Sequence, residues 1–231
     1  LQLGLMPEAA YAGEGIEGRV TCFIHIRLDE ILQGPLCIPA CWREQVEATL
    51  PTWPHLTRTI SVSDPGLAAP EGSVSSVSVR HFDFAGVSRV HIAAIGADFA
   101  DCVARELAQA RGQDFTVVQF FVSLGDAWTG QAAEVLRRAG GFFAGFLPQW
   151  FGPAGNGPDA LLVQVLLKPI PLAPIRTFTE RGAAVARRVI LDQQRACREF
   201  GAPQAAPLPD LDALCQPKEN AKQDTPEAAK E

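Results

Sequence analysis

The segment from Phe115 to Lys168 constrains the fold of this chain more than any other stretch of its 231 residues. Its opening run is almost wholly apolar, which is typical of a strand covered on both faces. After a break at Gly125, with Asp126 as the expected N-cap, apolar side chains recur at helical spacing until the pair Gly140–Gly141. A new apolar run follows at once. The segment therefore predicts a strand, a helix and two further strands in direct succession.

The rest of the chain mixes strands and helices. Alternating apolar residues predict a strand over 19–28, and Pro39 opens a predicted helix. Two more strands, over 74–84 and 87–95, are joined by a short connection, and a helix over 97–111 follows. Taken with the opening segment, this order fits the α/β and α+β classes and excludes an all-helical or all-β fold.

Composition divides the chain into four parts. Capping-box spacing between Thr177 and Glu180 predicts the start of a late helix, and the last residues are poor in apolar side chains other than alanine. We expect the late helix to pack back on the domain, with a homodimer contact as the alternative. The expected parts are an irregular lead-in at 1–17, one domain at 18–175, a C-terminal helix at 176–200 and a disordered tail at 201–231.

The bulk composition argues against several classes of partner. A formal net charge of −6 is the wrong sign for nucleic acid, whose phosphates require a basic surface, and for attachment to anionic lipid. No apolar run approaches the ~20 residues that cross a bilayer. Six scattered cysteines predict reduced, buried thiols in a cytoplasmic protein, with a secreted disulfide framework as the alternative.

Motifs of several enzyme classes are missing from the sequence. It has no Gly-x-Ser-x-Gly elbow, no Walker loop and no dinucleotide fingerprint. His81 and His91 stand on neighbouring predicted strands, where antiparallel pairing would bring them together as a metal or acid–base site; the alternative, which we expect, is a pair of hydrogen-bonded strand histidines and no metal. Trp150 and Phe151 lie in a Gly/Pro loop that lines a ligand site, docks a protein partner or, as the favoured alternative, simply connects strands.

The order of elements, together with Ala133 and the junction Gly141–Phe142, resembles the closing part of the N-acetyltransferase fold of the acyl-CoA N-acyltransferase superfamily. The resemblance covers about residues 18–170 and implies a mixed central β-sheet flanked by helices, with Val87–Ile95 as the central strand. It implies acetyl-CoA or another acyl-CoA as the cofactor, and a small molecule or a protein as the acceptor.

The resemblance also implies positions for the cofactor and for a base. The acyl-CoA would lie between the strands that end at Ile95 and Leu124, where such sheets splay, with Gly96 and Trp128 beside it. His91 on the central strand would act as the general base, and backbone groups would hold the thioester carbonyl.

Two positions depart from the pattern of that superfamily. At the expected pyrophosphate loop only Gly96 is present, and Asp98 and Asp101 would repel an anionic ligand. Arg137 occupies the place of the usual general-acid tyrosine, and an arginine does not donate a proton near neutral pH. The usual form of acetyl transfer is therefore in conflict with these residues.

A second similarity rests on Cys37–Pro39 early in the chain and Phe142–Pro148 late. These segments, with Asp159 and Gln164, resemble acetyltransferase-like domains attached to anti-sigma-factor-type ATPases in bacterial signalling proteins. That similarity implies an upstream fused domain. Two functions stay open: a divergent acyl-CoA-dependent N-acyltransferase of unknown acceptor, or a non-catalytic ligand-sensing or protein-interaction module on the same scaffold.

Overall fold

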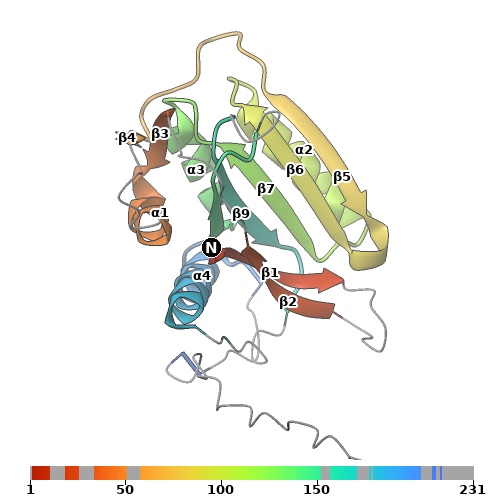
Figure 1. Cartoon of the computed structure of the whole chain (residues 1–231). Coiled ribbons are helices and arrows are strands. Elements are labelled where there is room, and N and C mark those ends of the chain that lie inside the picture. Colours follow the sequence, from red (N-terminus) through yellow and green to blue (C-terminus); the bar gives the residue numbers. More distant parts are fainter. Residues whose placement is uncertain are drawn as a thin grey trace, which may run out of the picture.

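The computed structural model places most of the chain in a mixed sheet with helices packed against it (Figure 1). The structure describes residues 2–10, 19–25, 34–50, 58–151, 157–170, 177, 179–203, 210–211 and 214. The mixed α/β class, with a mixed central sheet flanked by helices, is confirmed. In chain order the elements are β1 (Gln2–Ala10), β2 (Arg19–His25), β3 (Gly34–Pro39), η1 (Ala40–Trp42), α1 (Arg43–Thr49), β4 (Arg58–Ser63), β5 (Ser76–Phe82), η2 (Asp83–Ala85), β6 (Val87–Ala94), α2 (Phe99–Gly112), β7 (Val117–Ser123), α3 (Thr129–Arg138), β8 (Phe142–Leu147), β9 (Ala160–Leu166) and α4 (Glu180–Phe200).

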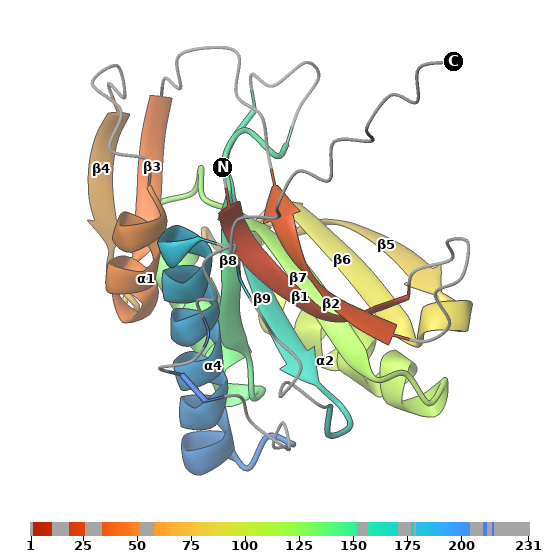
Figure 2. The same ribbon diagram turned by 60° about the horizontal axis from the view of Figure 1, so that its bottom comes forward.

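Seven described strands form the main sheet in the order β2-β1-β8-β9-β7-β6-β5. The pair β6–β7 is parallel, while β5–β6, β7–β9 and β8–β9 are antiparallel. At the far edge β1 pairs with β2 and β8 and also contacts η2, so the β1–β2 hairpin extends from β8 toward the β5–β6 connection (Figure 2). The sheet therefore carries helices on one face and this hairpin on the other.

Alternation along the strands separates two apolar layers. On the helix side, Val90, Phe120 and Val163 belong to the main core. One residue further along each strand, side chains point to the opposite face, where Phe121 and Leu162 form a smaller apolar cluster. Because β7 is buried on both faces over its whole length, its continuous apolar sequence is the pattern that a covered strand requires.

A separate two-stranded parallel sheet, β3–β4, packs beside α3. The backbone N–H of Cys37 on β3 donates to the carbonyl of Leu124 at 3.0 Å, which ties this small sheet to the end of β7. The helix expected from Pro39 begins as the single turn η1 and continues as α1. Neither β3 nor β4 was expected from the sequence, because both are short and their pairing partners are distant in the chain.

Two expected boundaries at the ends of the chain are wrong. The expected irregular lead-in at 1–17 contains β1, a strand that exists because it pairs with β2 and β8. The late helix starts at Glu180, and its N-cap is Thr179, whose hydroxyl accepts from the N–H of Gly182 at 3.0 Å. Thr177 instead donates its backbone N–H to the carbonyl of Leu214 at 3.0 Å.

The expected disordered tail is also wrong in part. Leu214 is 1% exposed and belongs to the main core, and Ala202 and Leu211 pack against that core. Burial of an apolar side chain explains why the chain returns to the domain after α4. Most of the remaining residues of 201–231 lie outside the described ranges.

The helix α4 packs back on the domain, as expected, against β8, β1 and α3. Its inward face includes Val185, Val189 and Ala196, all buried. The homodimer alternative for this helix stays a prediction. None of the described helices is both long and apolar enough to cross a bilayer.

Candidate functional site

His91 lies on the sheet face opposite to the helices. Its position on β6 is set by register: it stands directly across from Ser78 on β5 and from Phe121 on β7. The neighbours Val90 and Ile92 point into the main core. The strand pattern that buries those two residues therefore turns His91 toward the less covered face.

Three aromatic rings lie nearly parallel around this position. The ring centroids of His91 and Phe121 are 4.6 Å apart at an interplanar angle of 19°. Trp150, from the loop after β8, lies 5.0 Å from Phe121 and 6.1 Å from His91, both at 11°. Centroids at these separations with tilted or offset rings are the favoured geometry for aromatic pairs. Phe121 is buried, while His91 and Trp150 remain partly exposed.

The loop that carries Trp150 is held by two backbone contacts. The N–H of Gln149 donates to the carboxylate of Asp159 at 2.7 Å, and the N–H of Phe151 donates to the carbonyl of Pro158 at 3.1 Å. Gln149 adopts a left-handed conformation with φ of 50°. This strained turn brings Trp150 and Phe151 over the sheet.

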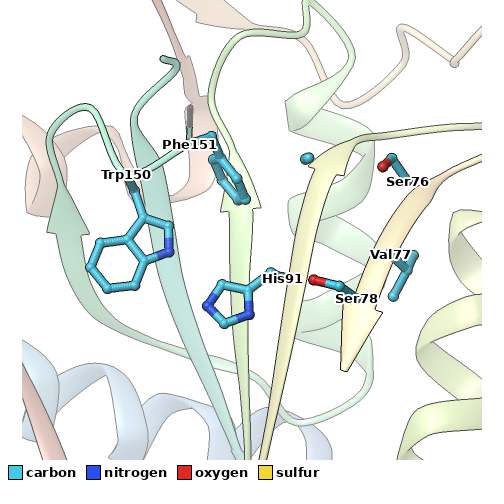
Figure 3. A pocket seen from close by; sticks show the side chains of 7 residues that line it. Ser76, Val77, Ser78, His91, Trp150 and Phe151 are labelled. Carbon is cyan, nitrogen blue, oxygen red and sulfur yellow. The ribbon is translucent and has the colours of Figure 1, made fainter. Parts of the chain in front are cut away.

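A pocket of about 400 Å³ opens beside these rings (Figure 3). The polar side-chain groups among its lining residues are two serine hydroxyls, the imidazole of His91 and the indole N–H of Trp150, and no acidic side chain is present among them. Trp150 and Phe151 in the Gly/Pro loop therefore line a cavity and do more than connect two strands. The lining residues are Ser76, Val77, Ser78, His91, Ala93, Trp150 and Phe151.

Burial lowers the pKa of His91 below its ordinary value of 6.5, and the positive charges of Arg89 and Arg80 lower this pKa further. The imidazole is therefore neutral at pH 7, with one ring nitrogen available as an acceptor. Arg80 and Arg89 stand directly opposite each other on β5 and β6, two residues from Ser78 and His91 along the same face. Two arginines therefore stand on the same sheet face as the lining residues Ser78 and His91, next to them along the strands.

The approach of His81 to His91 that a shared metal or acid–base site would require does not occur. His81 pairs in register with Ser88, not with His91, and its side chain is on the helix side, where it contacts Gln109 and the ring of Phe115. In this register, residues that stand opposite each other on one face are an odd number of positions apart, as Ser78 and His91 are, so the even separation of His81 and His91 places them on opposite faces. Within the described ranges, no group of three or more His, Cys, Asp or Glu side chains is arranged to hold a metal ion.

The residues assigned to an acyl-CoA do lie together, at the carboxyl ends of β6 and β7. Trp128 donates its indole N–H to the carbonyl of Ile95 at 2.8 Å, and the N–H of Ile95 donates to the carboxylate of Asp126 at 3.0 Å. Leu124 is bonded through its carbonyl to Cys37 and through its N–H to the carbonyl of Asp159. Ile95, Leu124 and Trp128 thus form a hydrogen-bonded junction at the ends of the two strands. Asp126 crosslinks the two strand ends instead of capping α3 through its side chain.

The start of α2, expected beside the cofactor's pyrophosphate, is covered by the segment 73–75. The N–H of Gly96 donates to the hydroxyl of Ser75 at 2.9 Å, and the N–H of Ala97 donates to the carbonyl of Ser73 at 3.0 Å. A side chain at Gly96 would meet the backbone of Val74 at 2.4 Å. A phosphate cradle needs such amides to be free, and so these residues do not fit an acyl-CoA pyrophosphate.

Arg137, at the place of the usual tyrosine, takes part in ion pairs. It contacts Glu134 and Glu199, each at 3.1 Å, and so joins α3 to α4. Cys41 lies nearby, and burial, followed by the charge of Glu134, raises its pKa to about 12. A thiol with that pKa is not a nucleophile at pH 7. The described side chains of Cys37, Cys41, Cys102 and Cys197 are free thiols.

Sequence reasoning named His91 and noted the Trp150–Phe151 loop, but it did not join them. The pocket also needs Ser76 and Ser78, whose position across from β6 depends on the hairpin register. Strict alternation of polar and apolar residues over 76–80 was the available signal. It showed that Ser76, Ser78 and Arg80 share one face.

The sequence matches no protein-family profile and no curated protein. Among solved structures, the chain is similar to a ribosomal-protein-alanine N-acetyltransferase from Brucella melitensis, with 24% identity and a TM-score of 0.31. The similarity covers 43% of this chain and 66% of that one. A partial likeness at that score assigns neither a family nor an activity to this chain.

Proposed function

We propose that this chain is a ligand-binding module on an acetyltransferase-like α/β scaffold, and that the pocket beside His91 is its ligand site. The observation that carries the proposal is the pocket itself. Its volume of about 400 Å³ falls in the range of about 300–1,000 Å³ that small-molecule sites occupy. Partly exposed aromatic rings with a few convergent polar groups are the usual lining of such sites.

The hydrogen-bonded junction supports binding rather than the usual acetyl transfer. Both backbone groups of Ile95 and the amides of Gly96 and Ala97, just before α2, are engaged within the chain. Opening the junction for a cofactor would break these bonds and leave Asp126 without its backbone partner, at a cost of about 1 kcal/mol for each bond. The similarity to ATPase-attached domains further suggests a fused upstream domain or a protein partner that responds to the bound ligand.

N-acyl transfer to a small-molecule or protein acceptor is the second candidate. One observation favours it: His91 faces the pocket and is neutral at pH 7, as a general base must be. This candidate requires that acetyl-CoA or another acyl-CoA binds in a place other than the closed start of α2. It therefore makes a separate prediction in the same experiment.

The proposal is tested by a thermal-shift screen of small aromatic and polar compounds, together with acetyl-CoA, longer acyl-CoAs and free CoA. Three proteins are compared: the wild type, Ala93→Phe, which fills the pocket, and Ala94→Phe, a change at the next position, which is exposed and does not line it. At a ligand concentration a hundredfold above Kd, we expect a rise in Tm of about 5–10 °C in the wild type and in Ala94→Phe, and none in Ala93→Phe.

The proposed site is rejected if no compound raises Tm, or if every rise persists in Ala93→Phe. A rise with any CoA species supports acyl transfer as well as binding. If all CoA species leave Tm unchanged, acyl transfer is rejected and the ligand-binding proposal remains.

A further inference from the structure

The rings and charges around the pocket narrow the kind of molecule that it would bind. We propose that the site selects a planar aromatic anion, such as an aryl carboxylate, with its ring on the surface formed by His91 and Trp150 and its charge directed toward Arg80 and Arg89. This inference rests on the proposed function, because it names the ligand class of the same pocket.

The flat part of the ligand is inferred from the ring planes. His91, Phe121 and Trp150 are within 19° of parallel, and Figure 3 shows the rings of His91 and Trp150 presented side by side at the pocket. Trp150 is 39% exposed, so part of its ring is accessible to a ligand. A planar ligand that stacks with an offset on this surface gains dispersion and quadrupole contacts that a saturated ring does not make.

The charge of the ligand is inferred from the arginine pair. Arg80 and Arg89 are direct cross-strand neighbours, and like charges in that position repel each other. The guanidinium of Arg89 is oriented by the side-chain oxygen of Gln119 at 3.0 Å and by the ring of Phe82 at 4.7 Å. An anion beside both arginines offsets their repulsion and forms charge-assisted hydrogen bonds.

The spacing of the two features fits one small molecule. Arg89 and His91 are two residues apart on the same strand and face, which places their backbones about 7 Å apart. A bicyclic aryl carboxylate spans that length. Ser76 and Ser78 add hydroxyl groups beside the ring, and an aromatic cation would meet two arginines and no acidic lining residue.

Isothermal titration calorimetry with three probes tests the inference on the full chain. The probes are 2-naphthoate, the uncharged 2-naphthamide and the saturated anion cyclohexanecarboxylate. We expect 2-naphthoate to bind the wild type, and each of the other two to bind about tenfold more weakly, because each lacks one of the two interactions.

Paired variants locate the two interactions. Arg80→Gln is expected to weaken 2-naphthoate about tenfold and to leave 2-naphthamide unchanged, while Arg138→Gln, at an exposed arginine on α3, changes neither. Trp150→Ala is expected to weaken both naphthyl probes about tenfold, and Phe84→Ala, at a phenylalanine that is 75% exposed and outside the pocket, leaves both unchanged.

Equal affinity for 2-naphthoate and 2-naphthamide, or an unchanged affinity in Arg80→Gln, overturns the choice of an anion. Equal affinity for cyclohexanecarboxylate and 2-naphthoate, or an unchanged affinity of Trp150→Ala for the naphthyl probes, overturns the choice of a planar ring. Failure of 2-naphthoate to bind overturns the ligand class as a whole. The ligand-binding proposal itself fails only if the wider thermal-shift screen also finds no compound whose effect disappears in Ala93→Phe.

Discussion

At the scale of single residues, two influences act on the His91 imidazole in the same direction. Burial and the charges of Arg89 and Arg80 both disfavour its protonated form and lower its pKa below 6.5. A histidine that is harder to protonate in the folded chain than in the unfolded chain makes folding sensitive to acid. The pocket therefore has a pH signature that does not require a ligand.

We predict that the free energy of unfolding depends on pH through His91. Above pH 6.5 both folded and unfolded chains carry a neutral His91, so the free energy of unfolding does not depend on this group. As the pH falls below 6.5, the unfolded chain binds the proton first and stability decreases, until the pH passes the lower pKa of the folded state. Urea unfolding between pH 8 and about pH 4.5 measures the effect.

Replacing the imidazole by an amide should remove that part of the pH dependence. We expect His91→Asn to show a smaller loss of stability than the wild type as the pH falls. Phe84→Ala, at an exposed side chain outside the pocket that does not titrate, is the control and should retain the wild-type slope. An identical pH profile for the wild type and His91→Asn would contradict the prediction.

Local sequence patterns predicted the strand that carries His91 but not the contacts of its side chain. His91 was identified from its place on the strand predicted over 87–95, which is present as β6 but lies next to the edge strand β5 and not at the centre of the sheet. Its aromatic neighbours come from β7 and from the loop after β8, at positions 121 and 150. Contacts over such separations depend on register and loop geometry, which local patterns do not specify.

At the scale of elements, one carboxylate joins α4 to two other parts of the fold. Asp192 accepts from the indole N–H of Trp42 at 2.8 Å and from the backbone N–H of Phe143 at 2.6 Å. It also forms an ion pair with Arg195 at 2.6 Å, and Arg195 donates to the carbonyl of Gly141 at 3.0 Å. Asp192 is only 5% exposed, so its partners have little access to water.

Removing this carboxylate should destabilise the domain strongly. In Asp192→Ala, the N–H groups of Trp42 and Phe143 and the charge of Arg195 lose their shared partner, and we expect a loss of about 3–5 kcal/mol in the free energy of unfolding. Glu47→Ala removes a carboxylate from the exposed pair with Arg43 and should cost about 0.5 kcal/mol or less. Urea unfolding of both variants measures the difference. Comparable losses in the free energy of unfolding would show that Asp192 does not hold α4 to the rest of the fold.

Elements in the Phe115–Lys168 segment were the easiest to predict. The strand β7, the helix α3 and the strands β8 and β9 follow the expected order, because covered strands and amphipathic helices have strong local patterns. The strand β1 contains Gly4 and Pro7, which made its sequence look irregular. Its pairing, rather than its propensity, makes it a strand.

At the scale of the whole molecule, residues beyond α4 contribute to the main core. Leu214 is 1% exposed, and its carbonyl accepts from both the backbone N–H and the hydroxyl of Thr177. The side chain of Arg187 reaches the carbonyl of Leu211 at 2.6 Å. These contacts attach the segment after the helix to the domain.

The prediction at this scale is that a late leucine matters to global stability. Leu214→Ala should lower the free energy of unfolding by about 2–5 kcal/mol, because it removes a fully buried side chain. Leu191→Ala changes the same residue type at a site that is 46% exposed on α4 and should change it by about 0.5 kcal/mol or less. Chemical denaturation measures the free energy of unfolding of both variants. A Leu214→Ala variant as stable as the wild type would show that the segment does not belong to the core.

The class of this fold and the order of the elements over Phe115–Lys168 could be predicted from local patterns, because apolar periodicity does not depend on distant partners. The sequence also indicated that Asp98, Asp101 and Arg137 conflict with ordinary acetyl transfer. Other features became visible only in the folded chain. Ser73 and Ser75 cover the start of α2, and Asp126 and Trp128 form hydrogen bonds with the backbone of Ile95. The pocket beside His91 lies on the other face of the sheet. Those outcomes depend on strand register and on hydrogen bonds between distant segments, which follow from the folded arrangement as a whole.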